Sequence, residues 1–173
     1  MRTIASVTTI ALASSVLVAG AASTAGAQKS NRAPLRTCAE GSLGYDAHAL
    51  PPIASSVVLV TVTNLAGSAC TIDRFPTVTF AGLDGTAQPV PPVSSGARRI
   101  DAAGKLYAAL RTDDRSGAAR YVPSLTVAAH PAHTGKTFTA AGIGAPAPGI
   151  AVSDPITTLW RNSVDEAVDA LPG

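Results

Sequence analysis

Apolar residues recur at every second position along much of this chain, and this alternation limits the fold more than any other feature of the sequence. In the stretch SSVVLVTVTNLAGSACTIDRFPTVTF, residues 55–80, Val58, Val60 and Val62 fall on one face of a strand. The other face carries Leu59 near its start and then threonines. Because successive side chains of a strand point to opposite faces, the pattern predicts a strand that is buried on one side and partly wet on the other.

The same period of two continues toward the C-terminus in short runs separated by turns. The residues predicted to point inward from these runs are Cys70, Ile72, Val78, Phe80, Leu106, Ala108, Leu110, Leu125, Val127, Ala129, Phe138 and Ala140. Strands at such short spacing are typical of an antiparallel sandwich or barrel, whereas βαβ units need helical stretches between the strands. The chain is therefore predicted to be all-β.

Turn and proline signals refine this plan. Asp84-Gly85 suits the positive φ angles of a tight turn, so this pair predicts a hairpin. The strand that follows carries Pro89, Pro91 and Pro92. Because proline has no N–H to donate to a ladder, we expect this segment at a sheet edge or outside the sheet.

The C-terminus carries the one helical pattern. Ser163 and Glu166 fit a capping box, and apolar residues follow at helical spacing up to Leu171. So short a helix is marginal unless it docks on the sheet. Residues 163–173 are thus expected to form either a short helix or a frayed tail.

The N-terminus has the pattern of an export signal. A basic residue is followed by the apolar run TIALASSVLVAGAA and by small residues at 25–27, which predicts a cleaved signal peptide over residues 1–27. A membrane anchor needs about 20 strongly apolar residues, whereas this run is short and diluted by Ser, Thr and Gly. We expect a secreted protein without a membrane span after cleavage, in which a flexible leader (28–36) precedes the β-domain (37–162).

Charge excludes some partners. The chain has 13 basic and 11 acidic residues, so its net charge of +2 gives no footprint for nucleic acid or for an anionic membrane. The partner is expected to be an extracellular protein or a cell-envelope glycan, and the protein is expected to be a monomer.

Two cysteines, Cys38 and Cys70, lie in the exported part of the chain. An even pair in an oxidising compartment predicts a disulfide, the alternative being two free thiols. Closing a loop of this length should stabilise the fold by roughly 3–4 kcal/mol. We predict that Cys38 and Cys70 are bonded, because Cys70 shares the inward parity of Ile72.

The order of motifs over residues 35–160 resembles a known family. A strand ending in Thr-Asn leads through a Gly/Ser turn to a cysteine, and then to an aromatic-proline pair, a V-x-F strand and a later L-x-V-x-x-P strand at residues 125–131. The matching positions before that last strand are Thr63, Asn64, Cys70, Phe75, Pro76, Val78, Phe80, Ile100 and Gly104. In these positions the chain resembles domain-of-unknown-function family 4232, a family of secreted actinobacterial proteins.

The resemblance implies an antiparallel immunoglobulin-like β-sandwich with no established activity. Members of the family often have a second cysteine pair, with one cysteine just before a late strand, where this chain has Arg120 and Tyr121. The comparison implies that a second bridge is absent here and that packing supplies the corresponding stability.

Histidines supply the first candidates for a chemical site. Gly135-Lys136-Thr137 matches the end of a phosphate-binding loop, but that motif needs a glycine where His130 stands, so a hairpin turn is predicted. His130 and His133 could bind a metal together with His48. No third ligand lies near them in sequence, and we interpret them as surface-loop residues.

Carboxylates and the lone tryptophan supply the others. Asp113 and Asp114 could hold calcium, but adjacent aspartates point in different directions, which favours a solvated loop paired with Arg111 and Arg115. Trp160 could offer a platform for a sugar, although packing in the core is the preferred interpretation.

No motif for nucleophilic catalysis, such as G-x-S-x-G or S-x-x-K, occurs in the chain. The sequence therefore predicts no catalytic, cofactor-binding or metal-binding residues. We expect a secreted, non-catalytic module with a binding or structural role. The alternatives are a small secreted hydrolase that uses His130 with Asp113 or Asp154, and a secreted inhibitor that acts through the loop at residues 112–120.

Overall fold

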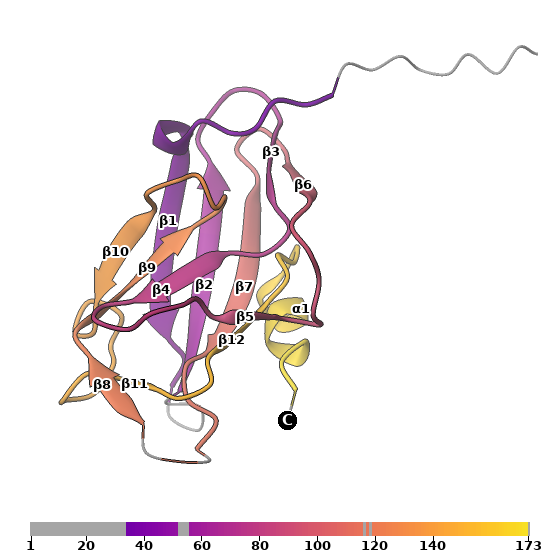
Figure 1. The fold of residues 1–173 in the computed structure, drawn as a ribbon. Coiled ribbons are helices and arrows are strands. Elements are labelled where there is room, and N and C mark those ends of the chain that lie inside the picture. The colour runs from indigo at the N-terminus through magenta and orange to yellow at the C-terminus, as the bar shows by residue number, and fades with distance from the viewer. Residues whose placement is uncertain (1–33, 52–55, 116, 118, 173) are drawn as a thin grey trace, which may run out of the picture. The chain divides into compact units, whose positions relative to one another are not determined.

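The structure is a computed structural model that describes residues 34–51, 56–115, 117 and 119–172. The signal peptide predicted for residues 1–27 and the first part of the predicted leader lie outside the described residues. The described chain is mostly strand (Figure 1). This confirms the predicted all-β class.

The elements follow one another along the chain as short strands, with one helix at the C-terminal end. In chain order they are the 3₁₀ helix η1 (Glu40–Ser42), β1 (Leu43–Ala49), β2 (Val57–Asn64), β3 (Cys70–Asp73), β4 (Thr77–Phe80), β5 (Gln88–Val90), β6 (Ala97–Ile100), β7 (Lys105–Arg111), β8 (Arg120–Val122), β9 (Ser124–Ala128), β10 (Lys136–Thr139), β11 (Ile150–Val152), β12 (Ile156–Thr158) and the helix α1 (Val164–Asp169).

One layer is a sheet of five strands in the order β1-β2-β7-β12-β5. All its pairs are antiparallel except β12 with β5. At its centre Val60 lies opposite Ala47 of β1 and Ala108 of β7, and all three side chains are buried. Val58 and Val62 are also buried, which confirms the predicted inward face of β2.

The proline-rich strand β5 lies at the edge of this sheet, as predicted. The predicted hairpin at Asp84-Gly85 is wrong, because β4 pairs with β9 and β5 pairs with β12. Gly82 and Gly85 do adopt positive φ angles of 72° and 90°, but the turn carries the chain from one sheet to the other. Pro89 lacks an N–H, so β5 is suited to a position with one strand neighbour.

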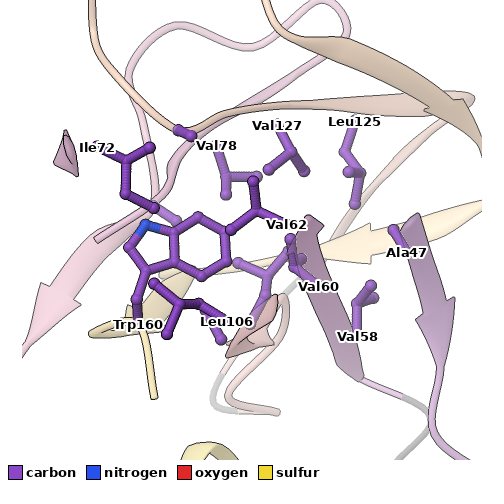
Figure 2. Close-up of a cluster of buried hydrophobic side chains, with 14 of the residues drawn as sticks. Ala47, Val58, Val60, Val62, Ile72, Val78, Leu106, Leu125, Val127 and Trp160 are labelled. Carbon is purple, nitrogen blue, oxygen red and sulfur yellow. The ribbon is translucent and has the colours of Figure 1, made fainter. Parts of the chain in front are cut away.

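The other layer contains the antiparallel sheet β10-β9-β4 and the two-stranded ladders β3-β6 and β8-β11. Val78 and Val127 are opposite each other in the pair of β4 and β9, and both point at the five-stranded sheet (Figure 2). Their side chains are fully buried with those of β2. The Tyr45 hydroxyl links the layers by accepting a hydrogen bond from the backbone N–H of Ala129 at 3.1 Å.

Trp160 lies in the core between the layers, with 2% of its surface exposed. Figure 2 shows its indole ring beside Ile72, Val62 and Leu106. The indole Nε1 has no hydrogen-bond partner among the described residues. The preferred interpretation of Trp160 as a packing residue is confirmed, and its burial excludes it as a sugar platform.

The helix α1 packs on the outer face of the five-stranded sheet. Its buried Ala167 belongs to one packed cluster with Leu59 of β2 and Ala109 of β7. The start of the β2 face that was predicted to be partly wet is therefore covered. The Ser163 hydroxyl accepts a hydrogen bond from the N–H of Glu166 at 3.2 Å, which is the predicted cap. Within the described residues no helix is long and apolar enough to cross a membrane.

Cys38 and Cys70 form a disulfide, with their Cα atoms 5.0 Å apart. The bond joins the segment before η1 to the start of β3, and both cysteines are buried in the main core. Backbone hydrogen bonds reinforce this junction: the N–H of Cys38 donates to the carbonyl of Thr71, and the N–H of Thr71 donates to the carbonyl of Arg36. The predicted bridge is confirmed.

Candidate functional site

The three histidines of the chain do not converge on one site. His48 is exposed on β1, where its Nδ1 lies 3.4 Å from an oxygen of Asp46. His130 and His133 lie together after β9, with their ring centroids 5.3 Å apart, and both are half-buried. Among the described residues, no three His, Cys, Asp or Glu side chains gather to hold a metal ion.

The segment from His130 to Phe138 supplies the turn between the paired strands β9 and β10 and the first residues of β10, which is the hairpin predicted from sequence. Gly135 has a φ of 80°, and a Cβ on it would meet the carbonyl oxygen of Val127 at 2.5 Å. Glycine is therefore required here by the hairpin. A phosphate-binding loop would need a helix at this point, whereas β10 follows.

Glu40 of η1 reaches this turn and was not singled out by the sequence. Its Oε1 accepts a hydrogen bond from the N–H of Gly135 at 2.6 Å. The backbone N–H groups of Gly135 and Thr134, and to a lesser degree the nearby His133, hold the pKa of the Glu40 carboxyl below its ordinary value. The contact ties the segment after Cys38 to the β9–β10 turn.

The loop that follows β7 is anchored at its start. Thr112 is buried, and both its N–H and its hydroxyl donate to the carbonyl of Ser56. The Asp113 Oδ1 then accepts from the N–H of Arg115 at 2.9 Å. Arg111, expected to pair with the aspartates, instead donates to the carbonyl of Pro172 at 2.7 Å.

A cleft of about 200 Å³ opens beside this loop. We call it the loop-end cleft, and the residues that carry the argument for it are Ser56, Asp113, Arg115, Tyr121, Ile143 and Gly149. Tyr121 is 58% exposed, although it is one of the few aromatic residues in the chain. Its neighbour Val122 is buried, and successive side chains of a strand point to opposite faces, so the Tyr121 ring points away from the core.

The structure does not bring together the residues that the hydrolase hypothesis requires. Asp113 lies before β8, which leads directly into β9, whereas His130 follows the far end of β9. Asp154 lies after β11, the partner of β8, and so belongs to the same end as Asp113. The histidine and the aspartates proposed for that mechanism therefore lie at opposite ends of β9.

The protein is an all-β sandwich with a buried core between its two layers. One disulfide links the segment before η1 to β3. Residues 38–161 match the family model described as Domain of unknown function (DUF4232), and the chain belongs to this family. No curated protein and no solved structure showed a match to the chain.

Proposed function

We propose that this protein is a secreted, non-catalytic binding module that holds a cell-envelope glycan in the loop-end cleft. The exposed ring of Tyr121 on the wall of this cleft carries the proposal. Export is supported by the signal pattern at residues 1–27 and by the Cys38–Cys70 bond, since disulfides persist in oxidising compartments.

The chemistry of the cleft suits a sugar. An exposed tyrosine offers an apolar ring face together with a polar hydroxyl, which matches the mixed C–H and O–H surface of a sugar. The Asp113 carboxylate lies in the same cleft and can accept hydrogen bonds from sugar hydroxyls. The cleft of about 200 Å³ is smaller than the roughly 300–1,000 Å³ of pockets that enclose drug-sized ligands. It therefore suits one small unit of a larger polymer.

The non-catalytic part of the proposal is supported by the separation of the candidate catalytic groups. A general base needs a hydrogen-bonded nucleophile or water within reach of the substrate. His130 lies beyond the opposite end of β9 from the loop-end cleft. We expect no turnover of polysaccharide or peptide substrates by the purified protein.

Co-sedimentation with insoluble peptidoglycan tests the proposal. The protein should pellet with the glycan in a saturable manner, and Tyr121→Ala should weaken binding at least tenfold because the stacking surface is lost. Leu65→Ala is the matched control. Leu65 is also a large exposed side chain, at 67%, but it follows the end of β2 farthest from Ser56. If the unmodified protein stays in the supernatant, or if Tyr121→Ala pellets as well as the unmodified protein, the proposal is wrong.

A further inference from the structure

A second cavity, of about 290 Å³, lies at the other end of the fold from the loop-end cleft. It opens beside the β3–β6 ladder, near the disulfide and the β9–β10 turn. We call it the Asp73 cavity, and the residues that define it are Thr37, Thr71, Asp73, Ser95, Ala97 and His130. No part of the proposed glycan site lies in it.

The floor of this cavity carries a buried carboxylate. Asp73 is 4% exposed. Its Oδ1 accepts two backbone hydrogen bonds, from Arg74 at 2.6 Å and from Gly96 at 3.0 Å. Its Oδ2 accepts none from the residues that the structure describes. One oxygen is therefore saturated, and the other is available to a ligand in the cavity.

No cation within the described residues forms an ion pair with Asp73. Arg74 is adjacent in sequence, and its guanidinium lies directly over Gly96, the residue whose N–H donates to Oδ1, so this cation is near Asp73 but forms no ion pair with it. A buried charge costs free energy unless it is paired, so this site favours a positive group that enters from solvent.

We propose that the Asp73 cavity binds a primary ammonium group, such as the side chain of a lysine. An ammonium is a compact charge with three donors, whereas a guanidinium is a planar fork that pairs best with both oxygens of a carboxylate. Since Oδ1 already accepts from two N–H groups, the single oxygen Oδ2 matches the ammonium. The Thr71 hydroxyl donates to the carbonyl of Arg36 at 3.3 Å, so its lone pairs remain to accept a second ammonium N–H.

An NMR titration of backbone amide signals tests this inference. The probe is Nα-acetyl-lysine methylamide, and the matched control probe is the same compound with its side-chain amine acetylated. The lysine probe should cause saturable shifts at Arg74 and Gly96, whose N–H groups bond to Asp73, and the acetylated probe should not. If neither probe gives saturable shifts there, or if both give equal shifts, the inference is wrong.

Two variants locate the effect. Asp73→Asn removes the charge but keeps an oxygen for the N–H groups of Arg74 and Gly96, and it should weaken binding at least tenfold. Asp101→Asn removes an exposed carboxylate beyond the other end of the β3–β6 ladder, and this variant should bind as the unmodified protein does. Binding that survives in a folded Asp73→Asn variant overturns the inference.

Ala97→Lys provides a test that does not remove the buried carboxylate. Ala97 is exposed and lies directly opposite Asp73 in the β3–β6 ladder, so a lysine there can place its own ammonium in the cavity. Probe binding should be lost, and the melting temperature should rise relative to Ala97→Met. If Ala97→Lys binds the probe like the unmodified protein, the assigned site is wrong. This outcome is independent of the glycan experiment, because Tyr121 lies outside the Asp73 cavity.

Discussion

The Oε1 atom of Glu40 accepts a 2.6 Å hydrogen bond from the backbone N–H of Gly135, a residue 95 positions later in the chain. The carboxylate thereby joins η1 to the β9–β10 turn, close to the place where Cys38 joins the same segment to β3. A covalent bond and a charge-assisted hydrogen bond thus fix the N-terminal edge of the sandwich.

Glu40→Gln should lower the melting temperature at neutral pH, because a neutral amide oxygen is a weaker acceptor than a carboxylate. The pKa of Glu40 is lowered in the folded state, so its contribution is present above the pKa of the unfolded chain and is lost as pH falls through the folded pKa. The difference between the two melting temperatures should therefore begin to shrink as the pH falls below the ordinary glutamate pKa of about 4.3. Thermal unfolding followed by circular dichroism from pH 7 to pH 3 measures this.

Asp84→Asn serves as the control for that series. Asp84 is exposed, and in the described structure its carboxylate makes no hydrogen bond or ion pair. Its melting temperature should follow that of the unmodified protein at every pH. A gap between Glu40→Gln and the unmodified protein that stays constant down to pH 3 would show that the carboxylate charge is not responsible.

Replacing Cys38 and Cys70 together by serine should lower the free energy of unfolding by roughly 3–4 kcal/mol, because a 32-residue separation is released in the unfolded chain. Urea denaturation of both proteins measures the difference. The unreduced protein should also yield a linked Cys38–Cys70 peptide by mass spectrometry. Identical urea midpoints for the variant and the oxidised protein would contradict the expected stabilisation.

Alanine substitutions at three glycines distinguish the cost of a positive φ angle from the cost of a steric clash of the new Cβ. Gly149 has a φ of 151°, and a Cβ there would lie 2.6 Å from the carbonyl oxygen of Val122, so Gly149→Ala should cost about 2 kcal/mol or more. Gly144 has a φ of 79° with nothing within 4 Å, so Gly144→Ala should cost about 1 kcal/mol. Gly67→Ala meets neither penalty and should be neutral or slightly stabilising. Urea denaturation that gives a different order would contradict this assignment.

The strand faces could be predicted because alternation is a local property of the chain. Val58, Val60 and Val62 reveal their inward face without knowledge of any other strand. The partner of a strand is not a local property. The sequence at Asp84-Gly85 therefore predicts the positive φ of Gly85 correctly, but not that the strands on either side of the turn pair with other strands. The covering of Leu59 by α1 is another long-range effect, because it depends on where the C-terminal helix docks.

The candidate sites were harder to predict than the fold for the same reason. The Oδ1 of Asp73 accepts a hydrogen bond from the N–H of Gly96, which lies 23 positions away in the chain. Glu40 and Gly135 lie 95 positions apart, so only the tertiary fold brings them together. Neither carboxylate belongs to a sequence motif, whereas the histidines and the aspartates of the loop after β7 stood out by residue type and do not come together.

Trp160 is the single tryptophan of the chain and reports directly on the core. Only 2% of its surface is exposed, so its fluorescence should be blue-shifted in the folded protein and should shift to the red on unfolding. Trp160→Ala should cost roughly 3–5 kcal/mol because a large cavity remains between the layers. Trp160→Phe should cost less, since the ring is partly replaced and Nε1 has no hydrogen bond to lose among the described residues. Urea denaturation compares the variants with Leu65→Ala, an exposed control that should be near neutral. If acrylamide quenched the fluorescence of the folded protein as strongly as that of free tryptophan, the core position of Trp160 would be contradicted.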